Sequence, residues 1–245
     1  MKYFDVFGKK KIIFAMLHLK GENSTIIMER TKREIDIYLS NNIDALIVEN
    51  YFGSEDDVEQ VLKYLNSEFP DIMYGVNMLD NDARGFEAAA QFNAKFIQLD
   101  SVAGHLTPDD DIAFAEKMNQ WRKLTPAVVL GGVRFKYQPY KSGRTLEEDL
   151  KIGINRCDAI VVTGSGTGVE TEISKIKEFR SVIGDFPLIV GAGVTPDNCK
   201  ERLALANGAI IGSYFKDNYK DDGEVDCSHV KKMIDTIINI AKEEI

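Results

Sequence analysis

A histidine and two acidic residues each follow a short apolar run in the first hundred residues: His18, Glu49 and Asp100. Histidine titrates near neutral pH, so His18 is a candidate general acid or base, and its alternative role is structural, bonded to a carboxylate or carbonyl. Glu49 and Asp100 could abstract a proton or stabilise a developing oxocarbenium charge. Their alternative is a structural ion-pair network with Arg134 and Lys136. We predict His18, Glu49 and Asp100 as the catalytic residues.

A fourth acidic residue, Asp82, follows the third apolar run. We expect it to cap the amino end of a helix, because aspartate favours that position. Together with Glu49 and Asp100 it would alternatively supply oxygen ligands for one Mg²⁺ ion. We predict no metal site and no cofactor, with magnesium as the alternative.

Glycine-rich turns follow three consecutive β-branched runs in the second half of the chain. Glycine lets the backbone approach a ligand closely, and a helix that follows such a turn presents free N–H groups to an anion. Thr195-Pro-Asp predicts one helix start directly after these turns, with proline at its first position. The alternative is that the glycines serve tight turns only. We predict phosphate binding by Gly164, Ser165, Gly166, Gly191, Gly193, Gly212 and Ser213.

Further polar residues stand at the predicted strand ends and in one basic, aromatic loop. Asparagine amides suit sugar hydroxyls, or alternatively bond across the strand ends. The loop 136–144 carries two tyrosines among its cations, which predicts either a mobile lid over a phosphate or base, or a solvated loop. The predicted substrate-binding residues are Asn50, Asn77, Arg134, Lys136 and Thr163.

The elements that must position these residues alternate between apolar runs and helical patterns. Eight such units predict a parallel sheet that closes into a single TIM barrel, (β/α)8, over residues 1–245. An open doubly wound sheet also alternates, but the first strand lacks a dinucleotide-binding fingerprint. Ser24, Ser54 and Thr145 are predicted helix caps. The predicted strands are 11–19, 43–50, 72–79, 94–101, 127–135 and three that begin at 158, 187 and 208; the helices are 24–42, 54–69, 82–93, 108–124, 145–157, about 170–184, 196–207 and 227–244.

The composition excludes several classes of protein. A net charge of −9 argues against general binding to nucleic acid or to an anionic membrane surface. Three isolated cysteines outside any C-x-x-C spacing fit a reduced cytoplasmic protein rather than a disulfide framework. No run of eighteen apolar residues occurs, so we expect no stable membrane insertion. A homo-oligomer is possible on these grounds.

The same stretches resemble the BtpA/SgcQ family of TIM-barrel proteins, which is related in fold to the phosphate-binding barrels. The likeness runs from the first strand to the last helix, but the chain departs from the family at Leu19-Lys-Gly-Glu22 and at Gln98-Leu-Asp100, which implies that its substrate differs. The matching stretches are Ala15-Met-Leu-His18, Val48-Glu-Asn50 with Phe52-Gly53, Gly75-Val-Asn77 with Asn81-Asp82, Val161–Gly168, Val190–Val194 with Asn198, Gly208–Gly212 with Lys216, and Val225-Asp226.

Two functions follow as hypotheses. The residues predict an enzyme that acts on a phosphorylated sugar or nucleotide-like metabolite, as an isomerase, a lyase or a glycosidic-bond-cleaving enzyme. The resemblance implies an alternative, because members of the family are tied to photosystem I biogenesis as well as to sugar-metabolism gene clusters. That alternative is a non-catalytic assembly or stability factor.

Overall fold

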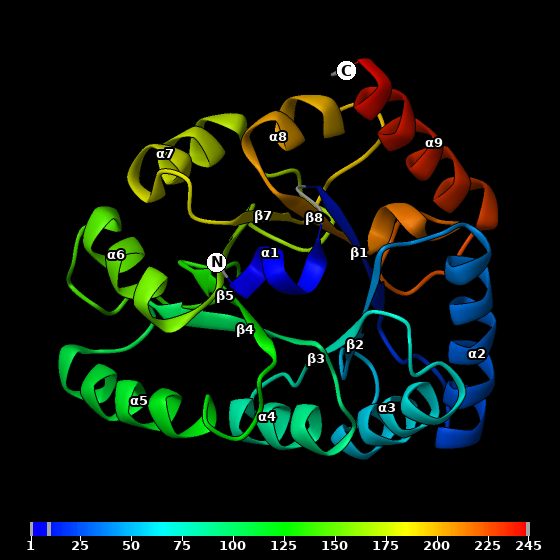
Figure 1. Ribbon diagram of the computed structural model, residues 1–245, viewed down its shortest axis with the longest axis horizontal. Helices are drawn as coiled ribbons and strands as arrows, with labels where there is room; N and C mark the ends of the chain where they lie inside the picture. Colours follow the sequence, from blue (N-terminus) through cyan, green and yellow to red (C-terminus); the bar gives the residue numbers. More distant parts are fainter. Residues whose placement is uncertain (1, 9–10, 244–245) are drawn as a thin grey trace.

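Eight parallel strands close into a barrel in the computed structural model, which describes residues 2–8 and 11–243 (Figure 1). Each strand pairs with the next along the chain, and β8 pairs with β1. The predicted TIM barrel is therefore confirmed. The strands are β1 (Ile12–Leu17), β2 (Ala45–Glu49), β3 (Tyr74–Asn77), β4 (Phe96–Ala103), β5 (Val128–Val133), β6 (Ala159–Thr163), β7 (Leu188–Gly191) and β8 (Gly208–Ile211).

A ring of helices surrounds the strands, and one short helix lies across the end of the barrel (Figure 1). In the described part of the chain, no helix is long and apolar enough to cross a membrane. The final predicted residue of the last helix, 244, lies outside the described residues. The helices are α1 (Lys2–Phe7), α2 (Ser24–Ser40), α3 (Glu55–Glu68), α4 (Asp82–Gln91), α5 (Pro108–Trp121), α6 (Leu146–Arg156), α7 (Ile173–Ile183), α8 (Cys199–Leu205), the 3₁₀ turn η1 (Ser213–Phe215) and α9 (Cys227–Glu243).

The structure confirms two of the predicted helix caps and corrects two others. Ser54 and Thr145 cap α3 and α6, and in both helices the third residue bonds back to complete a capping box. The cap of α2 is Asn23 rather than Ser24, because its side chain accepts from the backbone N–H of Ile26. Asn81 likewise caps α4, so the prediction for Asp82 was wrong.

The predicted helix start at Thr195-Pro-Asp was also wrong. The side chain of Asn198 accepts from the backbone N–H of Thr195 and donates to the carbonyl of Gly193. These two bonds hold residues 195–198 in a turn, and α8 begins only at Cys199. Residues 195–198 therefore form a turn that follows β7, and they are not part of α8.

The helix α1 was not predicted, and it seals the amino-terminal end of the barrel. Tyr3 and Phe7 are buried, and Phe7 contacts the rings of Phe14 and Phe96 inside the barrel at 5.3 and 5.6 Å between centroids. Aromatic pairs at such separations are favourable beyond the area that they bury. One apolar cluster joins this helix to the inward side chains of the strands, and a second cluster fills the space between strands and outer helices.

Inward positions change from apolar to polar along the strands. On β2 the inward residues are Ala45, Ile47 and then Glu49, since successive strand residues face opposite sides. β4 follows the same order, with Phe96 at the amino end and Asp100 at the carboxyl end, where its pairing with β5 shifts register between Leu99 and Ala103. The polar layer thus lies at the carboxyl ends of the strands, opposite α1.

We predict that Phe7→Ala lowers the free energy of unfolding by about 3 kcal/mol, because it leaves a cavity against Phe14 and Phe96. Urea denaturation measures the change. The matched control is Asp5→Ala on the exposed side of α1, which should change stability by about 0.5 kcal/mol or less. Equal effects of the two substitutions would contradict a sealing role for α1.

Candidate active site at the carboxyl ends of the strands

A cavity of about 240 Å³ opens at the carboxyl ends of the strands. Its walls come from β1, β2, β4, β6, β7 and β8 and from the loops that follow β2, β3, β5, β6, β7 and β8. All three predicted catalytic residues line it, together with several of the predicted binding residues. From the predicted set, the lining residues are His18, Glu49, Asp100, Lys136, Thr163, Gly191, Gly193, Gly212 and Ser213.

Asn77 joins the two acidic residues of the cavity. Its side-chain nitrogen donates to Glu49 Oε1 at 2.7 Å and to Asp100 Oδ1 at 3.2 Å. Asn77 does not line this cavity itself, and only 2% of it is exposed. The structure therefore places Asn77 behind Glu49 and Asp100, where it holds both carboxyl groups in position.

Burial makes Glu49 an acid at neutral pH. Removal from water, together with the neighbouring Asp100, raises the pKa of its carboxyl to about 8, against the opposing effects of Lys136 and the bond from Asn77. Burial also raises the pKa of Asp100. Glu49 thus carries a proton at pH 7 and can donate it.

The pKa of His18 is shifted in the opposite direction, downward. Burial and the nearby Lys216 ammonium lower the pKa of its imidazole to about 3, so the ring is neutral at pH 7. Its Nδ1 lies 3.1 Å from the backbone carbonyl oxygen of Asp221. A carbonyl only accepts hydrogen bonds, so Nδ1 carries the hydrogen and Nε2 keeps a free lone pair. The nitrogen of His18 that can accept a hydrogen bond or a proton is therefore Nε2.

The free nitrogen of His18 faces the protonated carboxyl. Nε2 lies 3.8 Å from Glu49 Oε2, a separation within reach of an ion pair. The pKa values argue against that ion pair, because both groups are buried and a neutral pair avoids the cost of desolvating two charges. One wall of the cavity thus presents a neutral base beside a neutral acid.

The glycine turns after β7 and β8 form an adjoining wall of the cavity. Ala192 and Gly193 both have positive φ, and successive residues of unusual conformation can turn neighbouring N–H groups toward an anion. A Cβ on Gly212 would lie 3.0 Å from the His18 ring, so this position needs glycine for closeness to the base. A Cβ on Gly193 would meet the backbone of Glu170 at 2.3 Å, which gives that glycine a packing role as well.

Besides Asn77, five of the predicted residues do not line this cavity. Gly164 and Ser165 line a separate depression beside the loop after β5, Gly166 lines neither space, and Thr167 and Gly168 reach the cavity instead. The Asn50 side chain bonds to the backbone of Leu79. The Arg134 side chain binds Asp149 and the carbonyl of Arg144.

The loop 136–144 is anchored at both ends. Lys136 donates from its backbone to Thr163 and from Nζ to Thr167, and Ser142 donates to the fully buried Asp149. Between these anchors Tyr137 and Tyr140 are more than 60% exposed. Closure of the loop as a lid stays a prediction, and it would involve mainly residues 137–140.

Several cavity residues were not predicted from the sequence. Tyr51, Gln98 and Tyr219 line the cavity. Tyr51 and Gln98 could have been predicted from the sequence. Tyr51 follows a strand end, and Gln98 lies two residues before Asp100 on the same strand face. Tyr219 lies in the loop after η1, where no periodic pattern marks it.

A second cavity of about 540 Å³ lies beside β3, β4 and α5. Asp82 lines it, and burial together with Asp100 raises the pKa of Asp82 to about 6. Although this cavity is larger, the His18–Glu49 pair lies in the first cavity, which we take as the candidate active site. Across residues 2–8 and 11–243, no three His, Cys, Asp or Glu side chains are grouped so that they could hold a metal ion.

A profile of the BtpA family matches residues 9–239. The chain belongs to the BtpA family. Among its relatives, an uncharacterized protein of Methanocaldococcus jannaschii is 28% identical, with 96% of this chain and 97% of that protein covered. The photosystem I biogenesis protein BtpA of Synechocystis is 24% identical, with coverage of 97% and 91%. The family resemblance inferred from the sequence is therefore confirmed.

Solved structures confirm the fold of this BtpA-family chain. Phosphoribosyl anthranilate isomerase from Thermus thermophilus superposes with a TM-score of 0.64, covering 94% of this chain and 99% of the isomerase. The identity is 12%, so the likeness shows the barrel alone.

We predict that Glu49→Gln stabilises this BtpA-family protein increasingly as pH rises from 5 to 8. In that window the unfolded Glu49 is ionised while the folded one stays protonated, so the wild type loses about 1 kcal/mol of stability per pH unit from this group. Glutamine removes the loss because it does not ionise. Urea unfolding at pH 5, 6, 7 and 8 measures the difference.

The control is Glu87→Gln on the exposed face of α4, which should shift stability equally at every pH. A constant difference between wild type and Glu49→Gln across the four pH values would show that Glu49 ionises normally.

Proposed function

We propose that this protein is an enzyme that transfers protons within a phosphorylated sugar or nucleotide-like metabolite, as an isomerase or a lyase. The observation that carries the proposal is the neutral pair in the cavity, with His18 Nε2 3.8 Å from Glu49 Oε2. Glu49, whose pKa of about 8 lies near neutral pH, can give a proton to one substrate atom and take one from another, while Nε2 of the neutral His18 accepts a hydrogen bond or a proton from the substrate.

The remaining walls of the cavity support a phosphorylated substrate. The turns after β7 and β8 bring Gly193, Gly212 and Ser213 to the cavity, and the loops after β7 and β8 are a common phosphate site in TIM barrels. Lys136 adds a cation to the same cavity. The substrate's phosphate lies on these turns in our proposal, so that its reacting carbons face His18 and Glu49.

Asp100 and Asn77 complete the proposed reaction centre. Asn77 fixes the orientation of both acids through its single amide nitrogen. Asp100 stabilises positive charge on the substrate while Glu49 donates its proton. Glycosidic-bond cleavage uses such a pair of carboxyl groups as well, but the neutral His18 base has no part in it.

We expect phosphorylated ligands to raise the temperature of thermal unfolding. A ligand at one hundred times its Kd stabilises by about 2.7 kcal/mol, which is on the order of 5–10 °C here. The panel contains inorganic phosphate, pentose and hexose phosphates, nucleotides, and the same compounds without phosphate. Ser213→Asp should raise the Kd at least tenfold because it places a carboxylate beside the phosphate, whereas Ser213→Ala should retain binding.

With the substrate from that screen, we expect kcat to fall as pH rises through about 8, because Glu49 then loses its proton. Glu49→Gln should lower kcat by about 10²–10⁴-fold while the Kd changes only a few-fold. Steady-state kinetics from pH 6 to 9 measure both effects. Full activity of Glu49→Gln would remove Glu49 from the mechanism.

The named relative from Synechocystis supports a second candidate, a non-catalytic assembly factor. In that case none of the phosphorylated compounds shifts the unfolding temperature. Substitutions at His18 and Glu49 would then leave function in cells intact, and this outcome separates the two candidates.

A further inference from the structure

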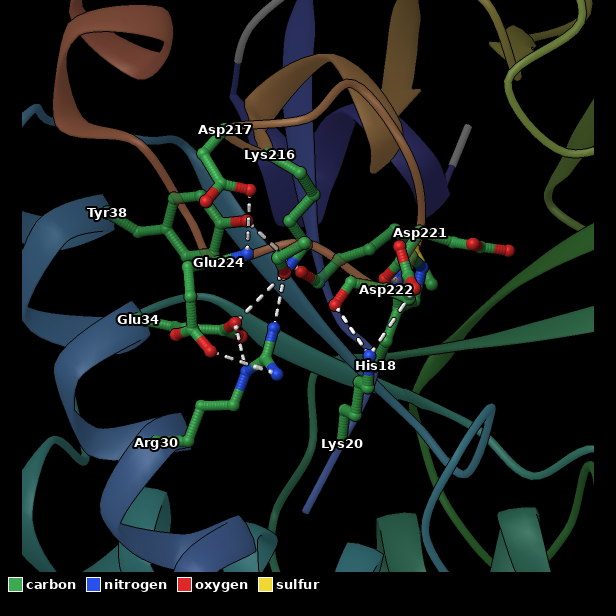
Figure 2. A network of polar contacts seen from close by, with 12 residues as sticks. His18, Lys20, Arg30, Glu34, Tyr38, Lys216, Asp217, Asp221, Asp222 and Glu224 are labelled. Carbon is green, nitrogen blue, oxygen red and sulfur yellow. Dashed lines mark hydrogen bonds and ion pairs between the residues drawn. The ribbon is translucent and has the colours of Figure 1, made fainter.

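The chain after β8 returns over the barrel mouth and contacts His18 (Figure 2). An antiparallel bridge between Lys216 and Val225 closes this excursion, and we call residues 217–224 the strap. The contact to His18 comes from the strap backbone, since the carbonyl of Asp221 accepts from Nδ1. The strap therefore decides which nitrogen of His18 is protonated.

An exposed tether holds one side of the strap. Lys20 Nζ donates to the backbone carbonyl of Asp222 at 3.0 Å and lies 3.4 Å from its carboxylate. Both side chains are 40% or more exposed, and exposed ion pairs contribute little. Lys20 alone is therefore a weak restraint.

A buried arginine on α2 holds the other side. The Arg30 guanidinium donates to the backbone carbonyl of Gly223 and pairs with Glu224 at 3.1 Å and with Glu34 at 3.1 Å (Figure 2). Arg30 is 8% exposed, and its planar fork fixes several acceptors at once. Arg30 thus connects the strap to α2 through the carbonyl of Gly223 and the carboxylate of Glu224.

The base of the strap is tied to the same carboxylate. Lys216 is 1% exposed, and its Nζ donates to Glu34 Oε1 at 2.9 Å. Glu34 thus receives Lys216 at the start of the strap and Arg30 near its end. Both ends of the strap are thus connected, through Lys216 and Arg30, to the one buried carboxylate of Glu34 on α2.

We propose that Arg30 is a positioning residue for His18: it holds the strap so that the carbonyl of Asp221 keeps the hydrogen on Nδ1 and leaves Nε2 free toward Glu49. The proposal deepens the proposed function, on which it rests for the use of Nε2 as the base. The hydrogen bond from His18 Nδ1 to the carbonyl of Asp221 can be tested in the absence of a substrate.

The other groups around His18 do not replace this contact. They are Glu49 at the end of β2, whose contact is with Nε2, Tyr51 just beyond it, whose ring packs 5.1 Å from the imidazole, Lys136 after β5 and Lys216 after η1. The two lysines act on His18 through their charge and lower its pKa. Loss of the strap would therefore leave Nδ1 without its acceptor.

The test is the tautomer of His18 in Arg30→Met, read by NMR of protein labelled with ¹⁵N in histidine. The sequence has three histidines, so the signals that disappear in His18→Gln are those of His18. We expect the wild type to show only the Nδ1–H form of His18 between pH 5 and 8. Arg30→Met should show both tautomers, and Arg30→Lys should recover part of the single form. In Arg30→Met, kcat for the substrate found in the thermal screen should fall at least tenfold while KM changes less than threefold.

Arg84→Met is the matched control, because Arg84 likewise binds three acceptors, all of them carboxylates, but lies on α4 away from the strap. It should leave the His18 tautomer unchanged. If Arg30→Met does not fold, Arg30→Lys keeps the charge but loses the planar fork, and its mixture of tautomers is the readout.

A single Nδ1–H tautomer in a folded Arg30→Met, or in Arg30→Lys where Arg30→Met does not fold, would overturn the proposal. The proposed function fails separately, when no phosphorylated compound binds the wild type. A mixed tautomer in Arg30→Met without any ligand binding would support the positioning role and reject the enzyme.

Discussion

Closure of the parallel barrel is the constraint on which the site depends. In a closed barrel alternate residues of every strand face the interior, and all carboxyl ends open at one rim. Phe14 and Phe96 fill the end that α1 covers, so the polar inward positions gather at the opposite end. Residues that are distant in sequence, such as His18, Glu49 and Asp100, therefore share one cavity.

The buried ionisable groups are stabilised in two different ways. Glu49 and His18 avoid the cost of burial by staying uncharged, as their shifted pKa values indicate. Glu34 lies between a buried lysine and a buried arginine outside the cavity. The uncharged pair faces the space that a ligand can enter, whereas the ion-pair network holds backbone segments in place.

The comparisons establish the scaffold more firmly than the chemistry. The match to the BtpA family spans nearly the whole chain, and the likeness to solved barrels reaches the same length at 12% identity. Chemistry in this fold is set by residues at the strand ends and in the loops that follow. The His18–Glu49 contact and the strap over it are the features of this chain from which a reaction can be argued.

The barrel could be predicted from the sequence alone, because it rests on local patterns. These are the alternation of apolar runs with helical patterns and helix caps such as Ser54 and Thr145. The sequence also placed the three predicted catalytic residues at strand ends, which closure then brought together. The short helix α1 and the strap escaped prediction, since neither has a periodic pattern and the contact from His18 to Asp221 crosses 203 positions. Protonation states were likewise decided only by the tertiary structure, because the depth of burial and the neighbouring charges that shift a pKa do not exist until the chain has folded.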